Sequence, residues 1–299
     1  MDLGRIAFTG ASGMLGRHFA EVLLANGVQA IGISRLADGS ASGWDLGNWK
    51  GDAELAKIFP SIDAIVHIGA LVPKPGQAVD LPNLYDCNVR SCMNLGFWAL
   101  KREIPMVFIS GAIVYENPWG LKQHETSPLG RNEVGGEYGL SKLLAEDVLS
   151  RLRSEGLKLA ILRPSSIYGT GLHVNKLISK LLESASCGEA IRLTPPVNDR
   201  YGLIHARDVG LAILATLERS CWQTMNLCSH ESPSLMQLAQ ACLDIAGSHE
   251  EVAVIGDNVD RAERHQFSLD TSRAEKLLDW RAGIDLMSGL DLMRRARFS

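Results

Sequence analysis

Tyr138 and Lys142 lie four residues apart in "GEYGLSKLLAEDVLSRLRSEG", a segment whose pattern predicts a helix. Residues at this spacing share one helix face, roughly 5–6 Å apart, so the phenol and the ammonium can meet. A neighbouring lysine favours the phenolate and is expected to lower the pKa of Tyr138 from its usual value of about 10. The pair therefore suits proton transfer, although the same spacing also occurs on ordinary charged helix faces.

A glycine-rich turn, "TGASGMLG", follows the first predicted strand and opens the first predicted helix. Glycines at this spacing allow a tight turn, the close approach of a pyrophosphate and the packing of helix on strand. The helix N-terminus adds unpaired N–H groups and a partial positive charge. The turn therefore predicts a dinucleotide site, with cofactor contacts from Gly10, Ser12, Gly13, Met14, Leu15 and Gly16.

The end of the second predicted strand indicates which dinucleotide binds. An acidic residue there would select the ribose 2′-hydroxyl of NAD, whereas an arginine suits the 2′-phosphate of NADP. The chain has Ser34 and Arg35 at this point, which favours NADP, while Asp38 nearby keeps NAD as an alternative. Asp45 and Leu46, after the next short strand, are expected near the adenine.

Alternating strands and helices must position these residues. Strands are predicted at 5–10, 28–34, 63–70, 105–115 and 157–164, with helices at 14–27, 88–104 and 136–156. This alternation implies right-handed βαβ crossovers and an α/β fold, a doubly wound parallel sheet of the Rossmann type.

After Tyr168 the alternation ends, which predicts a smaller, discontinuous C-terminal substrate lobe. Helices are expected at 175–188 and 232–247, with a short strand at 190–194 between them, while "TMNLCS" (224–229) reads as a further strand of the main sheet. The predicted division assigns 1–168 and a returning segment near 201–230 to the dinucleotide domain. The lobe then comprises 169–200 and 231–299.

Composition bounds the function. Hydrophobic residues make up 46% of the 299 residues, and the net charge of -4 gives no electrostatic case for nucleic acid or anionic membranes. No apolar stretch approaches the roughly 18 residues that span a bilayer. The six cysteines form no CxxC pair, and no export signal is evident, so a cytoplasmic protein with free thiols is expected.

Several motifs together resemble the extended short-chain dehydrogenase/reductase family, in its sugar-nucleotide epimerase/dehydratase branch. Besides the glycine turn and "EYGLSK", which matches the family's YxxxK motif, these are "VHIGA" (66–70), "NVRSCMNL" (88–95), "LRPSSIYG" (162–169), "LIHARDVG" (203–210) and "LDTSRAEKLLDW" (269–280). The resemblance spans nearly the whole chain. It implies hydride transfer between a nicotinamide cofactor and a sugar carbon.

The resemblance also implies roles for individual residues. Tyr138 would be the catalytic acid/base, and Lys142 would bind the nicotinamide ribose and lower the pKa of the tyrosine. Further cofactor contacts would come from Gly69, Ala70, Leu71, Asn88, Pro164, Ser165 and Ile167. The family further implies a homodimer built on the helices that contain Asn88 and Tyr138.

The chain departs from the family pattern at the end of the strand that precedes Tyr115. The family has Ser or Thr four residues before this tyrosine, where its hydroxyl bonds the reacting oxygen, and this chain has Gly111. Ser110 is the proposed substitute, and it reaches the site only if the backbone twists at Gly111. Ser165 and Ser166 are alternative donors. The next residues also lack the Asp-Glu pair of the dehydratases, which disfavours dehydration.

Three further residues are weaker candidates. His67 is expected in the core, and His205 is expected to be structural, with a place beside the substrate as its alternative. Arg200 is a candidate for binding the nucleotide diphosphate, because a guanidinium pairs with phosphate oxygens, although Tyr201 takes the better-matching position.

The sequence therefore predicts an NADP-dependent epimerase or ketoreductase acting on a nucleotide-linked sugar. A reductase of another small carbonyl compound and a catalytically weak dinucleotide-binding sensor or scaffold are the alternatives. No metal is predicted.

Overall fold

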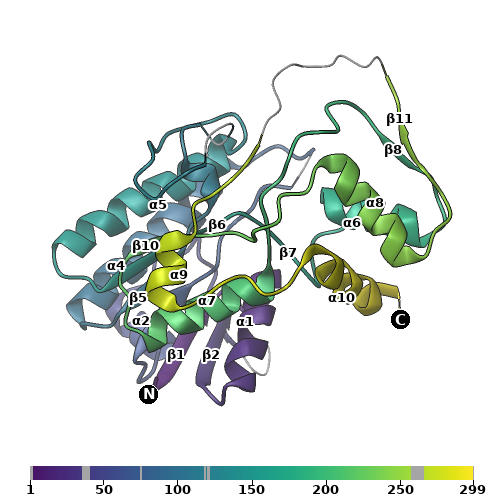
Figure 1. The fold of residues 1–299 in the computed structure, drawn as a ribbon. Coiled ribbons are helices and arrows are strands. Elements are labelled where there is room, and N and C mark those ends of the chain that lie inside the picture. The colour runs from purple at the N-terminus through teal and green to yellow at the C-terminus, as the bar shows by residue number, and fades with distance from the viewer. Residues whose placement is uncertain are drawn as a thin grey trace.

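The computed structural model describes residues 3–35, 41–74, 76–117, 119, 122–256 and 266–298. Within these residues, seven parallel strands form one sheet in the order β10-β6-β5-β4-β1-β2-β3 (Figure 1). In chain order they are β1 (Arg5–Thr9), β2 (Gln29–Ser34), β3 (Ala41–Gly43), β4 (Ala64–His67), β5 (Met106–Ile109), β6 (Leu159–Pro164) and β10 (Thr224–Leu227). The order reverses between β1 and β4, which is where ligands bind in open sheets of this kind.

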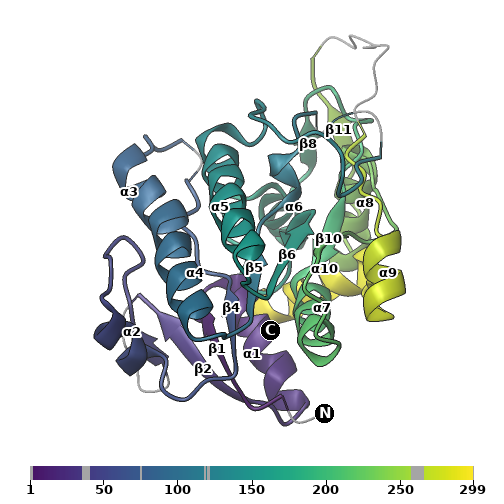
Figure 2. The same cartoon turned by 90° about the vertical axis from the view of Figure 1, so that its left-hand side faces the viewer.

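Helices cover both faces of the sheet. One face carries α1 (Met14–Ala25), α7 (Ala206–Glu218) and α9 (Ser272–Leu278). The other carries α2 (Asp52–Ile58), α4 (Ser91–Lys101) and α5 (Gly136–Ser154), with α4 and α5 side by side in Figure 2. Along each central strand the side chains alternate between these two cores, and nearly all are buried. Such strands read as continuous apolar runs because both faces lack water.

A third hydrophobic cluster holds the smaller lobe together. It is built on α6 (Leu177–Ser186), α8 (Leu235–Ala246) and α10 (Leu286–Phe298), which lie together in Figure 1. Two-stranded sheets add β8 (Ile191–Leu193) with β11 (Val252–Val254), and β7 (Ser166–Tyr168) with β9 (Leu203–His205). The lobe boundaries given above stay a prediction.

The predicted doubly wound α/β fold is confirmed, including the return of 224–229 to the main sheet, where β10 pairs with β6. The strand predicted at 105–115 is too long, because a 3-10 turn, η2 (Ala112–Val114), follows β5. The helix predicted from Asn88 starts earlier: α3 (Leu81–Tyr85) and a π-helical turn, η1 (Asp86–Arg90), lead into α4. No helix of the described ranges has the length and apolar character to cross a membrane.

Candidate active site

Helix α5 brings Tyr138 and Lys142 to the carboxyl end of β5. The Lys142 ammonium donates to the Ile109 carbonyl at 2.8 Å and lies 4.8 Å from the centre of the Phe108 ring. Lys142 is 3% exposed, so its aliphatic stem is packed and only its ammonium has polar partners. The predicted pair therefore stands at the edge of the sheet where a ligand of this fold binds.

Burial dominates the electrostatics of the pair. It raises the pKa of Tyr138 to about 12 and lowers the pKa of Lys142 to about 8, with Cys92 and Glu146 acting against the second shift. The expectation that Lys142 lowers the pKa of Tyr138 is wrong in this structure. The cause is that the ammonium points to the Ile109 carbonyl, while the phenol loses water, which disfavours the phenolate.

A buried ion pair fixes the middle of α5 to the neighbouring strand. Arg163 of β6 donates to Glu146 with Nη2–Oε2 at 2.6 Å and Nε–Oε1 at 3.0 Å, and both side chains are about 5% exposed or less. Arg163 also donates to the Tyr115 hydroxyl, which donates to Asn226 of β10 at 2.6 Å. This network, which no sequence pattern indicated, ties α5 to β6, to β10 and to Tyr115 just after η2.

The glycine turn has the close backbone packing and the helix N-terminus without a side-chain cap that a dinucleotide site needs. Gly10 has φ +74°, and a Cβ there would lie 2.8 Å from the Gly69 Cα. A Cβ at Gly16 would overlap the Gly10 carbonyl, so α1 packs on the turn only because residue 16 is a glycine. The N-cap of α1 is Gly13, whose lack of a side chain leaves the first amides of the helix free for phosphate oxygens.

Other predicted cofactor contacts gather around this turn. Gly69 follows β4, and a Cβ there would lie 2.8 Å from Leu46 Cδ1, so the predicted adenine and pyrophosphate segments adjoin. Arg35 is exposed just after β2, next to the buried Ser34. Asp38 lies outside the described residues. The predicted dinucleotide site is therefore bordered by the carboxyl ends of β1, β2 and β4, which are neighbours in the sheet.

His67 is a core residue, as predicted. Its side chain is fully buried, with Nδ1 2.7 Å from Thr9 Oγ1 and Nε2 3.3 Å from Ser91 Oγ. The Gly69 N–H also donates to Thr9 Oγ1, so the histidine supports the loop that follows β4. Burial, and then the charge of Lys142, lowers the pKa of His67 to about 3, which keeps the ring neutral.

His205 has the surroundings of a structural residue. It caps the N-terminus of α7, where Nδ1 accepts from the Arg207 N–H at 3.2 Å, and its ring contacts those of His18 and Tyr168. Burial, and then the neighbouring His18 and Arg207, lowers its pKa to about 4.

Gly111 does not have the twisted backbone that the sequence analysis required for Ser110 to turn inward. Its φ of -178° and ψ of 157° are extended, so any side chain is sterically allowed there. A Cβ at this position would meet only Ile113 Cγ1 at 3.6 Å and the Pro164 carbonyl at 4.0 Å. The Ser110 hydroxyl is buried and has no hydrogen-bond partner among the described residues.

The end of β6 places Pro164 and Ser165 beside β10, whereas Ile167 lies in β7, which pairs with β9. The Ser165 N–H donates to the Leu227 carbonyl at 2.8 Å, and its hydroxyl lies against the Cys228 thiol. Arg200, the candidate for the diphosphate, is exposed and donates to the Ser232 carbonyl at 2.7 Å. That bond engages only part of the guanidinium, which has five N–H donors.

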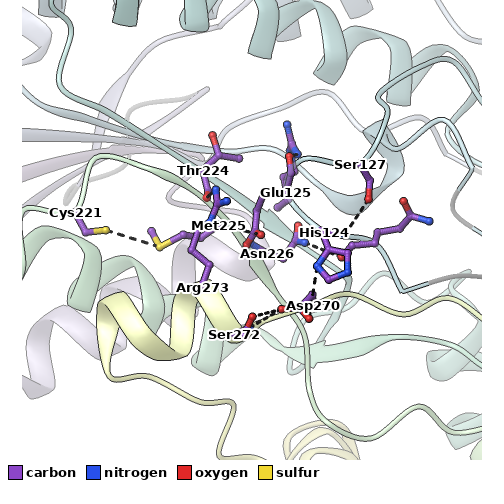
Figure 3. Close-up of polar contacts among 12 residues, drawn as sticks. His124, Glu125, Ser127, Cys221, Thr224, Met225, Asn226, Asp270, Ser272 and Arg273 are labelled. Carbon is purple, nitrogen blue, oxygen red and sulfur yellow. Dashed lines mark hydrogen bonds and ion pairs between the residues drawn. The ribbon is translucent and has the colours of Figure 1, made fainter.

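A polar groove at the amino end of β10 is a separate feature (Figure 3). In it Asp270 accepts from Ser272 and lies 3.7 Å from His124 Nδ1, beside Arg273 and Glu125. Ser272 is bonded to the carboxylate and not to the histidine, so these residues do not form a hydrolytic triad. The groove lies at the opposite end of the strand from the cofactor edge.

A parallel doubly wound sheet, a glycine turn at its switch point and a Tyr–Lys pair at the end of β5 define a dinucleotide-dependent enzyme of the Rossmann class. A model of the NAD dependent epimerase/dehydratase family matches residues 6–228. The chain belongs to this family, which confirms the resemblance to extended short-chain dehydrogenases/reductases.

Similar proteins include nucleotide-sugar enzymes of several activities. A dTDP-4-dehydro-6-deoxy-D-allose reductase of Streptomyces bikiniensis is 25% identical over 301 residues, which cover 92% of this chain and 90% of the relative. UDP-glucuronic acid decarboxylase 1 of Xenopus tropicalis is 21% identical over 303 residues, or 97% of this chain and 71% of the relative.

Solved structures share the fold across the whole chain. UDP-N-acetylglucosamine 4-epimerase from Bacillus cereus superposes with a TM-score of 0.84 at 21% identity, covering 99% of this chain and 100% of that one. UDP-glucuronic acid 4-epimerase from Bacillus cereus, solved with NAD, gives a TM-score of 0.82 at 19% identity, with 98% of each chain covered.

Proposed function

We propose that the protein is an NADP-dependent epimerase or ketoreductase acting on a nucleotide-linked sugar, with Tyr138 as the catalytic acid/base. The observation that carries the proposal is a buried lysine, Lys142, held at the carboxyl end of β5 one helical turn from Tyr138, beside a glycine turn that suits a dinucleotide. The relatives named above act on nucleotide sugars, which supports that substrate class.

The chain's own residues would divide the work as follows. The bound nicotinamide would supply or accept the hydride. Burial raises the pKa of Tyr138 to about 12, so its phenol is protonated at neutral pH and would donate its proton to a carbonyl oxygen. Lys142, still charged below its pKa of about 8, would hold the ribose and stabilise negative charge as it develops.

Reduction and epimerisation differ in what they ask of Tyr138. Reduction needs the phenol only as a proton donor, whereas epimerisation through a keto intermediate also needs the phenolate to remove a proton. A panel of nucleotide sugars and ketosugars, scored by NADPH oxidation and by product stereochemistry, tests the two. No turnover of any of them, with turnover of a simple carbonyl compound, would favour the alternative reductase.

Arg35 is proposed to select NADP. Arg35→Ala should weaken NADPH binding by about 10–100-fold, the worth of a charge-assisted hydrogen bond to the 2′-phosphate, and should leave NADH binding nearly unchanged. Fluorescence titration with both cofactors measures this. Arg151→Ala, on the exposed face of α5, is the matched control. Equal losses for NADPH and NADH would remove the argument.

Ser110 is proposed to replace the family hydroxyl on one ground, its buried hydroxyl with no partner among the described residues, while the extended backbone at Gly111 argues against this role. Ser110→Ala should then lower kcat by on the order of 10²-fold, the usual cost of one lost donor. Gly111→Ser should retain or raise activity, because the extended backbone and the open space accept a side chain. In the double variant the new hydroxyl should restore activity. Full activity of Ser110→Ala alone would exclude this role and return attention to Ser165 and Ser166.

A homodimer through α4 and α5 is proposed. Phe97 on α4 and Leu144 on α5 are exposed large apolar side chains on adjacent helices, and Leu140 and Val148 are only partly buried. A face of this kind is expected to be covered. Light scattering at micromolar concentration should give twice the chain mass, and Phe97→Glu with Leu144→Glu should give the monomer. A monomeric wild type would refute the dimer.

A further inference from the structure

A π-helical turn, η1, interrupts the helical run between α3 and α4, and it carries Asn88. The Ser91 N–H donates to the Asp86 carbonyl, five residues back, where an α-helix would use the carbonyl four residues back. Single π turns within α-helices are rare and occur frequently at functional sites. The turn therefore indicates a functional role for Asn88.

Side chains one turn further along support the irregular backbone. The Ser91 hydroxyl donates to the Cys87 carbonyl, and the Cys92 thiol lies 3.0 Å from the Asn88 carbonyl. In both bonds a side chain donates to the backbone carbonyl four residues earlier. These bonds satisfy carbonyl groups of the π-helical turn, which directs the Asn88 side chain toward the loop after β4.

Asn88 is 2% exposed, and its side-chain amide makes three hydrogen bonds within the protein. Oδ1 accepts from the Leu71 N–H at 2.7 Å, and Nδ2 donates to the Leu71 carbonyl at 3.0 Å and to Ser141 Oγ at 2.9 Å. Both donors and one acceptor site are thus used. Asn88 holds the loop that is predicted to contact the cofactor, and its amide does not face the cofactor itself.

Ser141 continues this chain of hydrogen bonds into α5. Ser141 lies between Tyr138 and Lys142 in the sequence, and its side chain is fully buried. Its hydroxyl accepts from the Asn88 amide and donates to the Tyr138 carbonyl at 2.7 Å. One unbroken series of bonds therefore runs from the Leu71 peptide through two buried side chains to the backbone of Tyr138.

We infer that Asn88 and Ser141 are positioning residues, which fix the loop after β4 and Tyr138 relative to each other. The inference rests on the proposed function, in which that loop holds the nicotinamide cofactor and Tyr138 moves the proton. Hydride and proton transfer to one substrate need both groups in register, and misplacement by about 1 Å can cost on the order of 10²-fold in rate. Buried supporting hydrogen bonds are how such a register is held.

The test separates positioning from cofactor binding. Ser141→Ala should lower the single-turnover rate of hydride transfer at saturating NADPH by about 10²-fold. Its NADPH dissociation constant should change by less than about fivefold, the equivalent of one ordinary hydrogen bond. Asn88→Ala should weaken NADPH binding and slow the transfer as well, because it also releases both groups of the Leu71 peptide. Ser141→Thr keeps the hydroxyl and should restore most of the rate.

Ser179→Ala is the matched control, since Ser179 on α6 is also buried and donates only to the Leu172 carbonyl at 3.4 Å. It should leave rate and affinity unchanged. A wild-type transfer rate in Ser141→Ala, or an equal loss in Ser179→Ala, would overturn the inference. Wild-type protein that binds NADPH and transfers no hydride would instead count against the proposed function. In that case unchanged NADPH affinity in Asn88→Ala would overturn the inference too.

Discussion

Tyr138→Phe should lower turnover by on the order of 10³-fold, within the range that a positioned acid/base contributes. The substitution removes only the hydroxyl, which is the group proposed to give its proton to the substrate oxygen. The ring, its packing and the Lys142 ammonium stay in place, because Lys142 bonds the Ile109 carbonyl and not the phenol. NADPH titration should therefore give the wild-type dissociation constant, while NADPH oxidation with the best substrate nearly stops.

Tyr85→Phe provides a matched control for this result. The Tyr85 hydroxyl donates to Glu137 at 2.8 Å, beside the start of α5, so it is a phenol near the site but outside the proposed chemistry. Its loss should change turnover little. If Tyr138→Phe kept substantial activity on a verified substrate, Tyr138 would be an ordinary residue of a helix face, and the acid/base would have to be sought elsewhere.

The sequence predicted the sheet, the glycine turn and the placement of the Tyr–Lys pair because each depends on local pattern. Buried parallel strands are continuous apolar runs, and "DAIVHIGA" became β4 with four buried residues. Gly16 of "TGASGMLG" is required by a contact within the same βα unit, with the Gly10 carbonyl, and Gly10 is favoured by its own positive φ. Such signals survive in a single sequence because the partners are close along the chain.

The direction of the Tyr138 pKa shift could not be read in this way. It depends on where the Lys142 ammonium points, and that is fixed by the Ile109 carbonyl, 33 residues away in the sequence. The spacing of four residues brings two groups to one helix face and does not decide which partner each chooses. Desolvation, the main cause of both pKa shifts, is likewise a property of the packed structure.

The supporting residues were missed for a related reason. Glu146 and Arg163 are surrounded by ordinary helix and strand sequence, and only tertiary packing makes them a buried ion pair. Ser141 stood inside the opening motif, yet its role depends on Asn88, 53 residues earlier. The π turn also has no simple sequence pattern. A serine and a cysteine that each bond the carbonyl four residues earlier, as Ser91 and Cys92 do, are nevertheless a signal that could help to predict such a turn.

Lys142→Met should abolish most activity without destabilising the fold. The substitution removes a charge beside the reacting groups, which should lower kcat by on the order of 10²–10³-fold. It also removes a proposed ribose contact, so NADPH affinity should fall by about tenfold or more. Loss of both rate and affinity would distinguish Lys142→Met from Tyr138→Phe. Lys101→Met, at an exposed position of α4, should change neither.

Stability should respond to Lys142→Met in a way that depends on pH. Burial holds the pKa of Lys142 at about 8, below the unfolded value of 10.5, so the folded protein binds this proton more weakly than the unfolded chain. The wild type therefore carries a cost below pH 8 that is relieved as the pH rises toward 10.5. Methionine fills a similar volume without that cost. The Tm of Lys142→Met should equal or exceed that of the wild type at pH 7. The difference in Tm between variant and wild type should then decline between pH 8 and 10.5. A difference in Tm that did not change with pH would mean that Lys142 keeps an ordinary pKa. That result would contradict the prediction that burial lowers the pKa of this lysine.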